Sequence, residues 1–412
     1  MLALDKYFSG VWLNKSYRYY WTARFLTSLC PQIIAVAIGW HIYDITRDPL
    51  YLGLVGLSQF LPQILLVIIT GYVSDKFNRK IISFTCLILE SILAFSFLLI
   101  LLIDQSNYLL FFIPLVGLGI VRAFIYPAEI SLIANIVEEK DLPQAVALST
   151  LSWQTASIFG PVMGGILYGI SAFLPYIISG IGALYASILI LSVTIISQNL
   201  NKSSFINLKT ITSGFKYIYN NQVLFGVISL DLFAVLLAGA VALLPVYARD
   251  ILDAGPIALG VLRSAPAIGA VLVGLYLALY PIKNNSGLIL LIAVAFFGIV
   301  TIIFGLSKNI LISIFFLVLV GAFDMLSVYI REVLIQLRTE DHMRGKVNAI
   351  NGMFIGASNE LGEFRAGFMA SGIGAVPTVV IGGIGAIFVS GAWYFIFPKL
   401  RNISNLKEIK YK

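Results

Sequence analysis

The sequence is poor in charged residues. Asp, Glu, Lys and Arg make up 11% of its 412 residues, whereas soluble domains carry about a quarter. Hydrophobic residues reach 59%, and a soluble domain cannot bury that much apolar surface. Lipid must therefore be the solvent for most of the chain, and we predict an all-α membrane protein.

Cysteine and histidine are also scarce, with two of each. Cys30 and Cys86 lie in apolar runs and are expected to be free, buried thiols. His41 and His342 are isolated, so no metal site is predicted. The sequence lacks a phosphate-binding G-x-x-x-x-G-K-(S/T) loop and any convergent nucleophile and base, which argues against ATP-driven transport, an enzyme or a cofactor.

Long apolar segments are abundant. A membrane-spanning helix needs about 20 mostly apolar residues. Twelve segments qualify, at residues 18–43, 51–73, 81–103, 108–134, 144–169, 173–197, 222–247, 257–280, 287–306, 309–336, 346–371 and 374–397. We predict two six-helix halves, 1–197 and 222–412, joined by a cytoplasmic linker, 198–221, that contains an amphipathic segment, 206–219.

The distribution of Lys and Arg predicts the orientation. With a cytoplasmic N-terminus, 19 of the 27 Lys and Arg residues fall in cytoplasmic segments and 5 inside spans. The opposite loops hold Arg47, Arg249 and Lys308. Because cytoplasmic loops are enriched in Lys and Arg, both termini are predicted to be cytoplasmic. The net charge of +7 then favours contact with anionic lipid headgroups, not with nucleic acid.

The halves carry a weak internal repeat. A shift of 202 residues aligns Gly119 with Gly321, Leu132 with Leu334, and Gly160 with Gly362. The same shift places Arg122 on Asp324 and Glu129 on Arg331, so equivalent positions hold opposite charges. Within each half these positions lie about two helical turns apart, on one face. Two repeated halves that face a shared cavity with charged stripes predict a transporter.

The loop after the second span reads G-Y-V-S-D-K-F-N-R-K from residue 71. It resembles the signature loop of the major facilitator superfamily, G-x-x-x-D-(R/K)-x-x-R-(R/K), with Gly71, Asp75, Arg79 and Lys80 at the key positions. Arg122 resembles the span-four arginine of proton-linked members. This resemblance implies twelve helices in two six-helix halves.

Span five adds a glycine–proline sequence, Gly160, Pro161, Gly164 and Gly165, which resembles the motif of antiporters in that superfamily. A closer resemblance is to the enterobactin-exporter-like branch of siderophore and drug exporters, some of whose relatives are proposed in siderophore uptake. The matching stretches are 23–26, 39–44, 54–62, 351–352 and 358–364. The second copy of the signature loop, near 280–287, departs from the pattern and keeps only Lys283 as a charge.

Ionisable residues inside the spans are candidates for function, because each costs roughly 2.5–3.5 kcal/mol to insert. The resemblance implies that spans one, four, seven and ten line the cavity. The candidate substrate-binding residues are Arg24, Arg122, Asp231, Asp324, Arg331, Trp40, Tyr126 and Trp153. Arginine binds carboxylates through a planar fork, so an organic anion fits. The alternative is a set of fixed ion pairs that only hold helices together.

Acidic residues are the candidates for proton coupling. These are Glu129, Asp324, Glu360 and Glu363. The last two share a face of span eleven, where mutual repulsion favours protonation of one, and the alternative is that they anchor that span. Glu90 and Arg263 are given less weight because spans three and eight are more peripheral.

The gating candidates are Gly71, Asp75, Arg79, Lys80, Gly160, Pro161 and Gly164. Asp75 is expected to meet the positive N-terminus of span eleven and to latch the halves closed. Arg79 and Lys80 are expected to orient Asp75 and to contact headgroups. For the glycine–proline sequence, a flexing point and simple close packing are equally open.

These features predict a secondary transporter of a siderophore or similar amphiphilic organic anion, working by alternating access and by proton-coupled export. Uptake of a ferric siderophore and broad drug export are the alternatives. The expected setting is the bacterial inner membrane, as a monomer among lipids.

Overall fold

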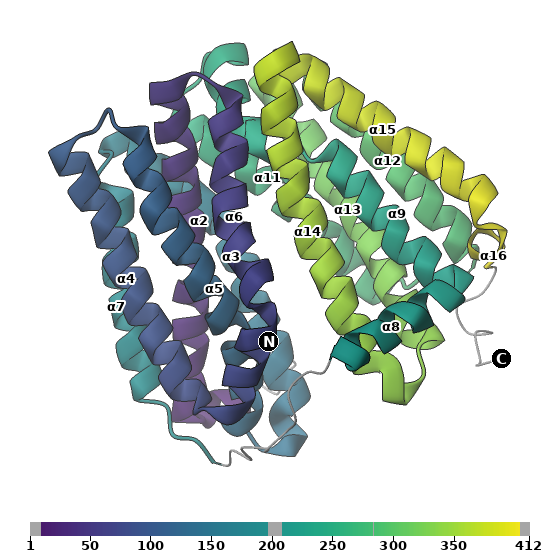
Figure 1. Ribbon diagram of the computed structural model, residues 1–412, viewed down its shortest axis with the longest axis horizontal. Helices are drawn as coiled ribbons and strands as arrows, with labels where there is room; N and C mark the ends of the chain where they lie inside the picture. The colour runs from purple at the N-terminus through teal and green to yellow at the C-terminus, as the bar shows by residue number, and fades with distance from the viewer. Residues whose placement is uncertain (1–9, 197–207, 283, 404–412) are drawn as a thin grey trace. The chain divides into compact units, whose positions relative to one another are not determined.

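The computed structural model describes residues 10–196, 208–282 and 284–403, apart from the side chains of residues 68, 72, 75 and 208–211. In this part of the chain the regular structure is helical, which confirms the all-α prediction. Twelve helices of 17–33 residues correspond to the twelve predicted spans (Figure 1). They are α2 (Lys15–Thr46), α3 (Pro49–Lys76), α4 (Arg79–Ile103), α5 (Phe112–Leu132), α6 (Leu142–Ile170), α7 (Leu174–Leu191), α9 (Gln222–Ala238), α11 (Pro256–Leu279), α12 (Ser286–Leu306), α13 (Ile310–Arg338), α14 (Asp341–Ile373) and α15 (Ala375–Ile396).

Ten helical stretches of the described chain are long and apolar enough to cross a membrane. They do not include α6 and α14, which are long but more polar. In α14 the polar residues include Glu360, Glu363 and Arg365. Polar groups at membrane depth are tolerated where protein or a water-filled cavity covers them, so we expect α6 and α14 to turn their polar residues away from lipid.

Two helices end at least six residues before the predicted ends of their spans. Helix α9 ends before Gly239 instead of running to residue 247. The chain then passes through η5 (Val241–Leu243), α10 (Leu244–Val246) and the π-helical η6 (Tyr247–Ile251). Pro245 cannot donate a backbone hydrogen bond to a continuous helix, which helps to explain the break. Helix α7 ends at Leu191, six residues before the predicted end.

The chain forms two compact units, of which unit 1 comprises residues 1–45 and 58–206. In unit 1, α4 lies against both α5 and α7 (Figure 1). Helix α6 lies close to α2, where a Cβ on Gly164 would be 2.8 Å from the carbonyl oxygen of Ile33. A buried cluster including Tyr17, Leu87 and Leu132 joins α2, α4 and α5. These contacts hold α2 and α5 at the positions on which the candidate site depends.

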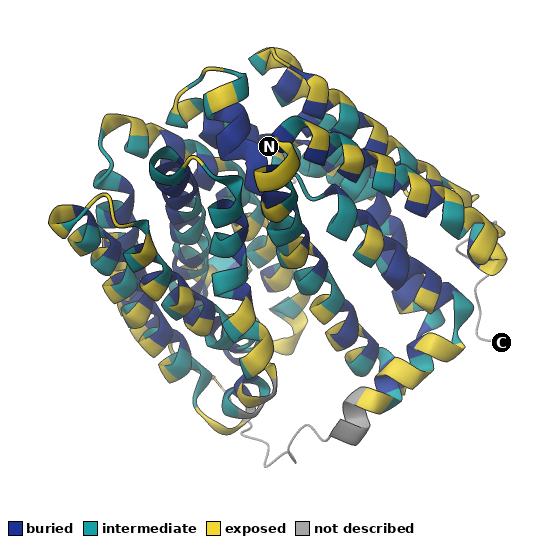
Figure 2. Cartoon of the chain, turned by 45° about the horizontal axis from the view of Figure 1, so that its top comes forward, coloured by how far each residue is buried: buried dark blue, intermediate teal, exposed yellow. Residues whose placement is uncertain are grey.

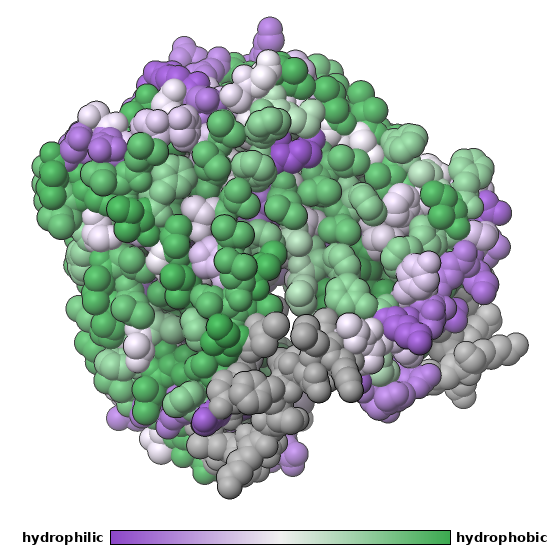
Figure 3. Space-filling view, viewed as in Figure 1, coloured by the Kyte–Doolittle hydropathy of each residue, from purple (hydrophilic) through white to green (hydrophobic). Residues whose placement is uncertain are grey.

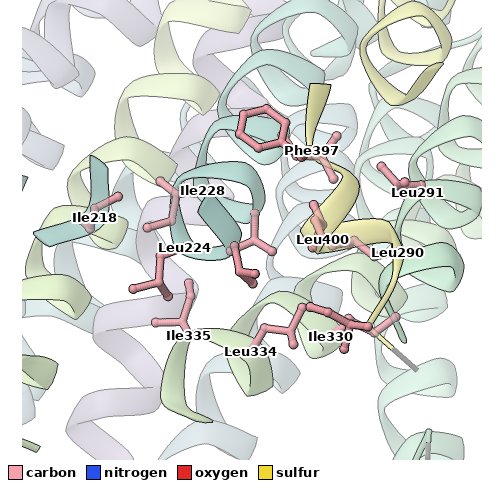
Figure 4. Packing of buried hydrophobic residues seen from close by; sticks show 14 of the residues in the cluster. Ile218, Leu224, Ile228, Leu290, Leu291, Ile330, Leu334, Ile335, Phe397 and Leu400 are labelled. Carbon is pink, nitrogen blue, oxygen red and sulfur yellow. The ribbon is translucent and has the colours of Figure 1, made fainter. Parts of the chain in front are cut away.

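Unit 2 comprises residues 46–57 and 207–412. Here α12 packs on α13 and α15, α11 packs on α13, and α9 packs on α14 and α15. Figure 4 shows the apolar cluster at one end of the unit, where Leu224 and Ile228 of α9 meet Ile330 and Leu334 of α13 and Leu400 of α16 (Pro398–Arg401). This cluster fixes α9 against α13.

Helix α3 contributes to both units. Its first turns group with unit 2, where a Cβ on Gly53 would lie 2.9 Å from the carbonyl oxygen of Phe364. A Cβ on Gly367 would lie 2.7 Å from the carbonyl oxygen of Pro49. The remainder groups with unit 1, where Gly119 of α5 touches the backbone of Gln59. Small residues permit such close approach of helices in a membrane.

The outer faces of the long helices are apolar. Helix α4 buries Leu87, Ala94 and Leu101 and exposes Ile92 and Leu99. Figure 2 shows the same alternation of buried and exposed residues along other helices. In Figure 3 hydrophobic side chains cover most of the visible face, and hydrophilic ones gather toward its edges. Such a surface suits a lipid environment.

The predicted linker contains α8 (Leu208–Asn220), and residues 198–207 of that linker lie outside the description. Ile218 is buried, whereas Phe215 and Tyr219 are exposed, so α8 has one packed face and one open face. The Tyr217 hydroxyl donates to the carbonyl oxygen of Arg338 at 3.4 Å. Helix α8 is thereby attached to unit 2 beside the end of α13.

Candidate functional site

Unit 1 contains a buried ion pair between α2 and α5. Arg24 Nη1 donates to Glu129 Oε2, and the Glu129 side chain is 1% exposed. One turn before Arg24, the Tyr20 hydroxyl donates to the backbone carbonyl of Glu129 at 3.1 Å. The exposed ring of Tyr126 lies 6.0 Å from the guanidinium carbon of Arg24. Arg24 therefore has a carboxylate partner and an aromatic ring nearby.

A second acid and a second arginine lie close to this pair. Glu90 of α4 is 4% exposed, and Arg122 and Glu129 of α5 act on it electrostatically. Among the described residues, Glu90 Oε1 has no hydrogen-bond partner. Glu90 received less weight as a sequence-based candidate, although it is the only charged residue in the apolar run 81–103. Unit 1 thus gathers two carboxyl groups and two arginines across three helices.

Unit 2 has a comparable ion pair between α9 and α13. Arg331 Nη1 pairs with Asp231 Oδ1, and their side chains are 3% and 10% exposed. The neighbouring carboxylate of Glu332 accepts a hydrogen bond from Asn351 Nδ2 at 2.9 Å. Glu332 is therefore tied to α14, and Asp231 is the carboxylate that pairs with Arg331.

The two ion pairs follow the internal repeat with their charges exchanged. Each pair joins the first helix of a half to the fourth, α2 to α5 and α9 to α13. In the first half the arginine is on the first helix, and in the second half it is on the fourth. The glycines repeat as well: Gly119 touches α3 and Gly321 touches Pro266 of α11, while Gly160 approaches α2 and Gly362 approaches α9.

The other acidic candidates lie elsewhere in unit 2. Asp324 is half-buried on α13, about two turns before Arg331. A Cβ on Gly56 of α3 would lie 3.0 Å from Glu360 Oε2 and 3.4 Å from Glu363 Oε2, so both carboxyl groups converge on this glycine. Arg263 of α11 acts electrostatically on Glu363. This contact with the start of α3 fits the anchoring alternative for Glu360 and Glu363.

The aromatic candidates occupy different settings. Trp40 is buried in α2, and Trp153 is exposed on α6. The ring of Tyr126 lies beside the guanidinium of Arg24, so Tyr126 is the aromatic candidate next to the Arg24–Glu129 pair.

The signature loop is held within unit 1. Arg79 Nη1 donates to Asn135 Oδ1 at 3.0 Å and to the carbonyl oxygen of Ser131 at 3.4 Å. Lys80 Nζ donates to the carbonyl oxygen of Val193 at 2.8 Å. These bonds tie the start of α4 to the ends of α5 and α7. The side chain of Asp75 and the residue Lys283 lie outside the description, so the latch stays a prediction.

The glycine–proline sequence of α6 faces α2. A Cβ on Gly160 would lie 2.5 Å from the Cβ of Gln32. Helix α6 continues through Pro161, and Gly164 and Gly165 are buried. Gly71, the remaining gating candidate, lies near the end of α3 and is half-buried. The contacts of Gly160 and Gly164 fit the close-packing reading of this sequence.

Cys30 and Cys86 are buried, free thiols, as predicted. His41 Nδ1 lies 2.8 Å from the Tyr168 hydroxyl. The described residues contain no group of three or more His, Cys, Asp or Glu side chains arranged to hold a metal ion.

Comparison with known proteins assigns the family. Residues 11–410 match the transmembrane secretion effector family of the major facilitator superfamily. The staphyloferrin A transporter of Staphylococcus aureus is 24% identical over 403 residues, which cover 93% of this chain and 97% of that relative. The enterobactin exporter EntS of Citrobacter koseri is 21% identical over 400 residues, covering 94% and 93%.

The fold has a solved counterpart. An inward-facing, occupied structure of a bacterial homologue of the human lysosomal transporter Spinster superposes with a TM-score of 0.72 at 14% identity, covering 94% of this chain and 97% of that one. This likeness concerns the fold alone. The family and these relatives are transporters, so the protein is a multi-pass membrane transporter and not an enzyme. The chain belongs to the transmembrane secretion effector family of the major facilitator superfamily, in the part of it that includes siderophore transporters and exporters.

Proposed function

We propose that this transporter carries a siderophore or similar amphiphilic organic anion across the bacterial inner membrane by alternating access. The observation that carries this proposal is one arginine in each unit, Arg24 with a side chain 12% exposed and Arg331 with one 3% exposed, each paired with one internal carboxylate. Arginine holds carboxylates through charge-assisted, often bidentate bonds. Glu129 and Asp231 therefore stand where the carboxylates of a substrate would bind.

The relatives support this substrate class. Two that match over nearly the whole chain are named for staphyloferrin A and for enterobactin, both of which are siderophores. Broad drug export has weaker support, because multidrug resistance protein 1 of Bacillus subtilis matches only 31% of this chain, at 33% identity. Tyr126, exposed beside Arg24, offers an apolar surface for an amphiphilic anion.

Two directions of transport are candidates. Export in exchange for protons is supported by the relative named an enterobactin exporter and by the antiporter-like sequence of α6. Uptake of a ferric siderophore is the second candidate, because the Arg24–Glu129 and Arg331–Asp231 pairs suit an anion carried in either direction. In both, Glu129, Asp324, Glu360 and Glu363 are the acids proposed to couple protons, and the protein acts as a monomer in lipid.

Binding to the purified protein tests the proposal. Staphyloferrin A and enterobactin, each iron-free and ferric, are titrated into wild-type protein and into the double variant Arg331→Gln, Asp231→Asn. Removing both charges keeps the interior neutral, so a folded variant is expected. We expect saturable binding by the wild type and at least tenfold weaker binding by the double variant.

A matched control distinguishes the loss of this binding site from the effect of removing any ion pair. Arg344 Nη1 lies 2.8 Å from Asp341 Oδ1, and the Arg344 side chain is 42% exposed. The double variant Arg344→Gln, Asp341→Asn therefore removes a surface ion pair from the same unit. This control is expected to bind as the wild type does. Equal binding by wild type and the Arg331 double variant would overturn the role of Arg331, and no binding of any siderophore by folded wild type would overturn the substrate class.

A further inference from the structure

One arginine inside the predicted span 346–371 has no acidic partner among the described residues. Arg365 of α14 is half-buried, and its Nη1 donates to Met369 Sδ at 3.2 Å. A thioether sulfur is a weak acceptor, and the buried Nε of Arg365 has no hydrogen-bond partner in the described part of the chain. No described carboxyl group pairs with it. The guanidinium therefore has donors and a positive charge to offer to an anion.

The nearest acid along the chain points in another direction. Glu363 precedes Arg365 by two residues, which is about 200° around a helix. The carboxyl group of Glu363 approaches Gly56 of α3, and Arg263 of α11 acts on it electrostatically. Glu363 therefore does not neutralise Arg365. A charge at membrane depth is stabilised by a counterion, and for Arg365 the described residues do not supply one.

Arg365 departs from the expectation that α14 turns its polar residues away from lipid. Leu361, Phe368 and Gly372 lie on the same helix face, four residues before it and three and seven after it. Leu361 is 39% and Phe368 63% exposed, and a Cβ on Gly372 would have no atom within 4 Å. The opposite face, at Gly367, packs on the start of α3. Arg365 is thus placed on the outward, apolar face of α14.

The Arg365 side chain extends toward one membrane surface. Its contact Met369 lies one turn nearer the end of α14 at Ile373. That end is opposite the start of the helix beside α8, so the predicted orientation places it away from the cytoplasm (Figure 1). Long basic side chains extend along a helix in this way to bring their charge to the headgroups. The open space at Gly372 lies on the same face, about 10 Å along the helix from Arg365.

We infer that Arg365 is a binding site for an anionic phospholipid of the leaflet that faces away from the cytoplasm. The planar guanidinium holds the phosphate, the headgroup occupies the space beside Gly372, and the acyl chains run past Phe368 and Leu361. A phospholipid combines the two chemistries that this face offers, an unneutralised cation and exposed apolar side chains. The inference does not depend on the substrate proposed above.

Photocrosslinking in proteoliposomes gives a readout confined to this site. A trace of phosphatidylglycerol or of phosphatidylcholine, each with the same diazirine in its acyl chain, is added to phosphatidylcholine vesicles that contain the protein. Attachment to residues 361–373 is measured by mass spectrometry of peptides. In the wild type we expect about fivefold more attachment of phosphatidylglycerol, since one arginine near the surface favours an anionic lipid by about that factor.

Arg365→Gln is expected to lower the attachment of phosphatidylglycerol to the level of phosphatidylcholine. Arg365→Lys is expected to lie between this variant and the wild type, because lysine keeps the charge but lacks the planar fork. The control Lys308→Gln removes an exposed charge that is predicted to lie on the same side of the membrane. This control is expected to match the wild type.

A second variant leaves Arg365 in place. Gly372→Leu fills the proposed headgroup space and is expected to lower the attachment of phosphatidylglycerol. The matched control Gly391→Leu, at a glycine of α15 that also has no atom within 4 Å of a Cβ, is expected to leave it unchanged. If Arg365→Gln does not fold, this comparison decides.

Equal attachment of the two lipids in the wild type would overturn the inference, and so would undiminished attachment of phosphatidylglycerol in Arg365→Gln or in Gly372→Leu. An equal loss in Lys308→Gln would also overturn it, since general surface charge would then be the cause. Loss of siderophore binding by Arg365→Gln with unchanged lipid attachment would assign this arginine to the substrate instead.

Discussion

At the scale of single residues, the free energy of each buried ion pair combines a large desolvation penalty with a large electrostatic attraction. Removing Arg24 and Glu129 from water costs several kcal/mol for each ion, and their attraction in a low-dielectric interior repays this cost only when the pair is complete. The net contribution of a complete buried pair to folding is therefore small. The loss of one partner is expensive, because a charge is then left buried alone.

This asymmetry gives a prediction for unit 1. Glu129→Leu leaves the Arg24 guanidinium without its carboxylate and is expected to lower stability by about 3–5 kcal/mol. Adding Arg24→Met, which removes the second charge at similar volume, is expected to restore most of that loss. Thermal unfolding of the detergent-purified variants, followed by size-exclusion recovery, measures both. If the double variant is as unstable as the single one, the pair is a net stabilising contact and the reading of Glu129 as a displaceable partner fails.

At the scale of helices, glycines set how closely neighbours approach. Gly119 and Gly321 occupy equivalent places in the repeat, and each lies against the backbone of a neighbouring helix, α3 in one case and α11 in the other. A methyl group at either position would collide with a carbonyl oxygen. Gly391 of α15 has no atom within 4 Å of where a Cβ would stand.

Gly321→Ala is therefore expected to destabilise the protein by about 1–3 kcal/mol, since backbone atoms would have to move apart. Gly391→Ala is the matched control in another transmembrane helix, and it is expected to be neutral or slightly stabilising, because alanine favours helix more than glycine does. Melting temperatures of the two variants in one detergent provide the comparison. Equal melting temperatures would mean that α11 and α13 are not in close contact at this position.

Helices were easier to predict from the sequence than their contacts. Ten of the twelve spans follow from length and apolar composition alone, which are local properties, whereas α6 and α14 are long but more polar. The break after α9 was missed because Gly239 and Pro245 sit in a run that is apolar throughout, and apolar composition does not distinguish a broken helix from a continuous one. The end of α7 was placed too late for a similar reason, since Val193, Ile195 and Ile196 are apolar but lie past the last helical turn.

The candidate site was predicted in part. The repeat identified Glu129 and Arg331 as equivalent positions of opposite charge, but it contained no information on which helix faces meet. The partners Arg24 and Asp231 were known only as charges on other spans, and their pairing depends on tertiary packing. Glu90 was underweighted because its span was judged by its place in the superfamily, although a lone carboxyl group in an apolar run was itself the stronger physical signal.

At the scale of the whole molecule, the direction of transport has meaning only once the orientation in the membrane is known. The predicted orientation rests on the 19 to 3 distribution of Lys and Arg. Lys140 follows the end of α5, and Lys308 lies between α12 and α13; both side chains are exposed. The prediction places Lys140 in the cytoplasm and Lys308 on the opposite side.

Single cysteines test this orientation. The background is Cys30→Ser with Cys86→Ser, since both native thiols are buried, and each reporter, Lys140→Cys or Lys308→Cys, is added to it separately. In intact spheroplasts a membrane-impermeant maleimide is expected to label position 308 and to spare position 140 until the membrane is permeabilised. The reverse pattern would mean that the molecule has the opposite orientation. Labelling of both positions in intact spheroplasts would place them on the same side, which contradicts the odd number of membrane crossings predicted between position 140 and position 308.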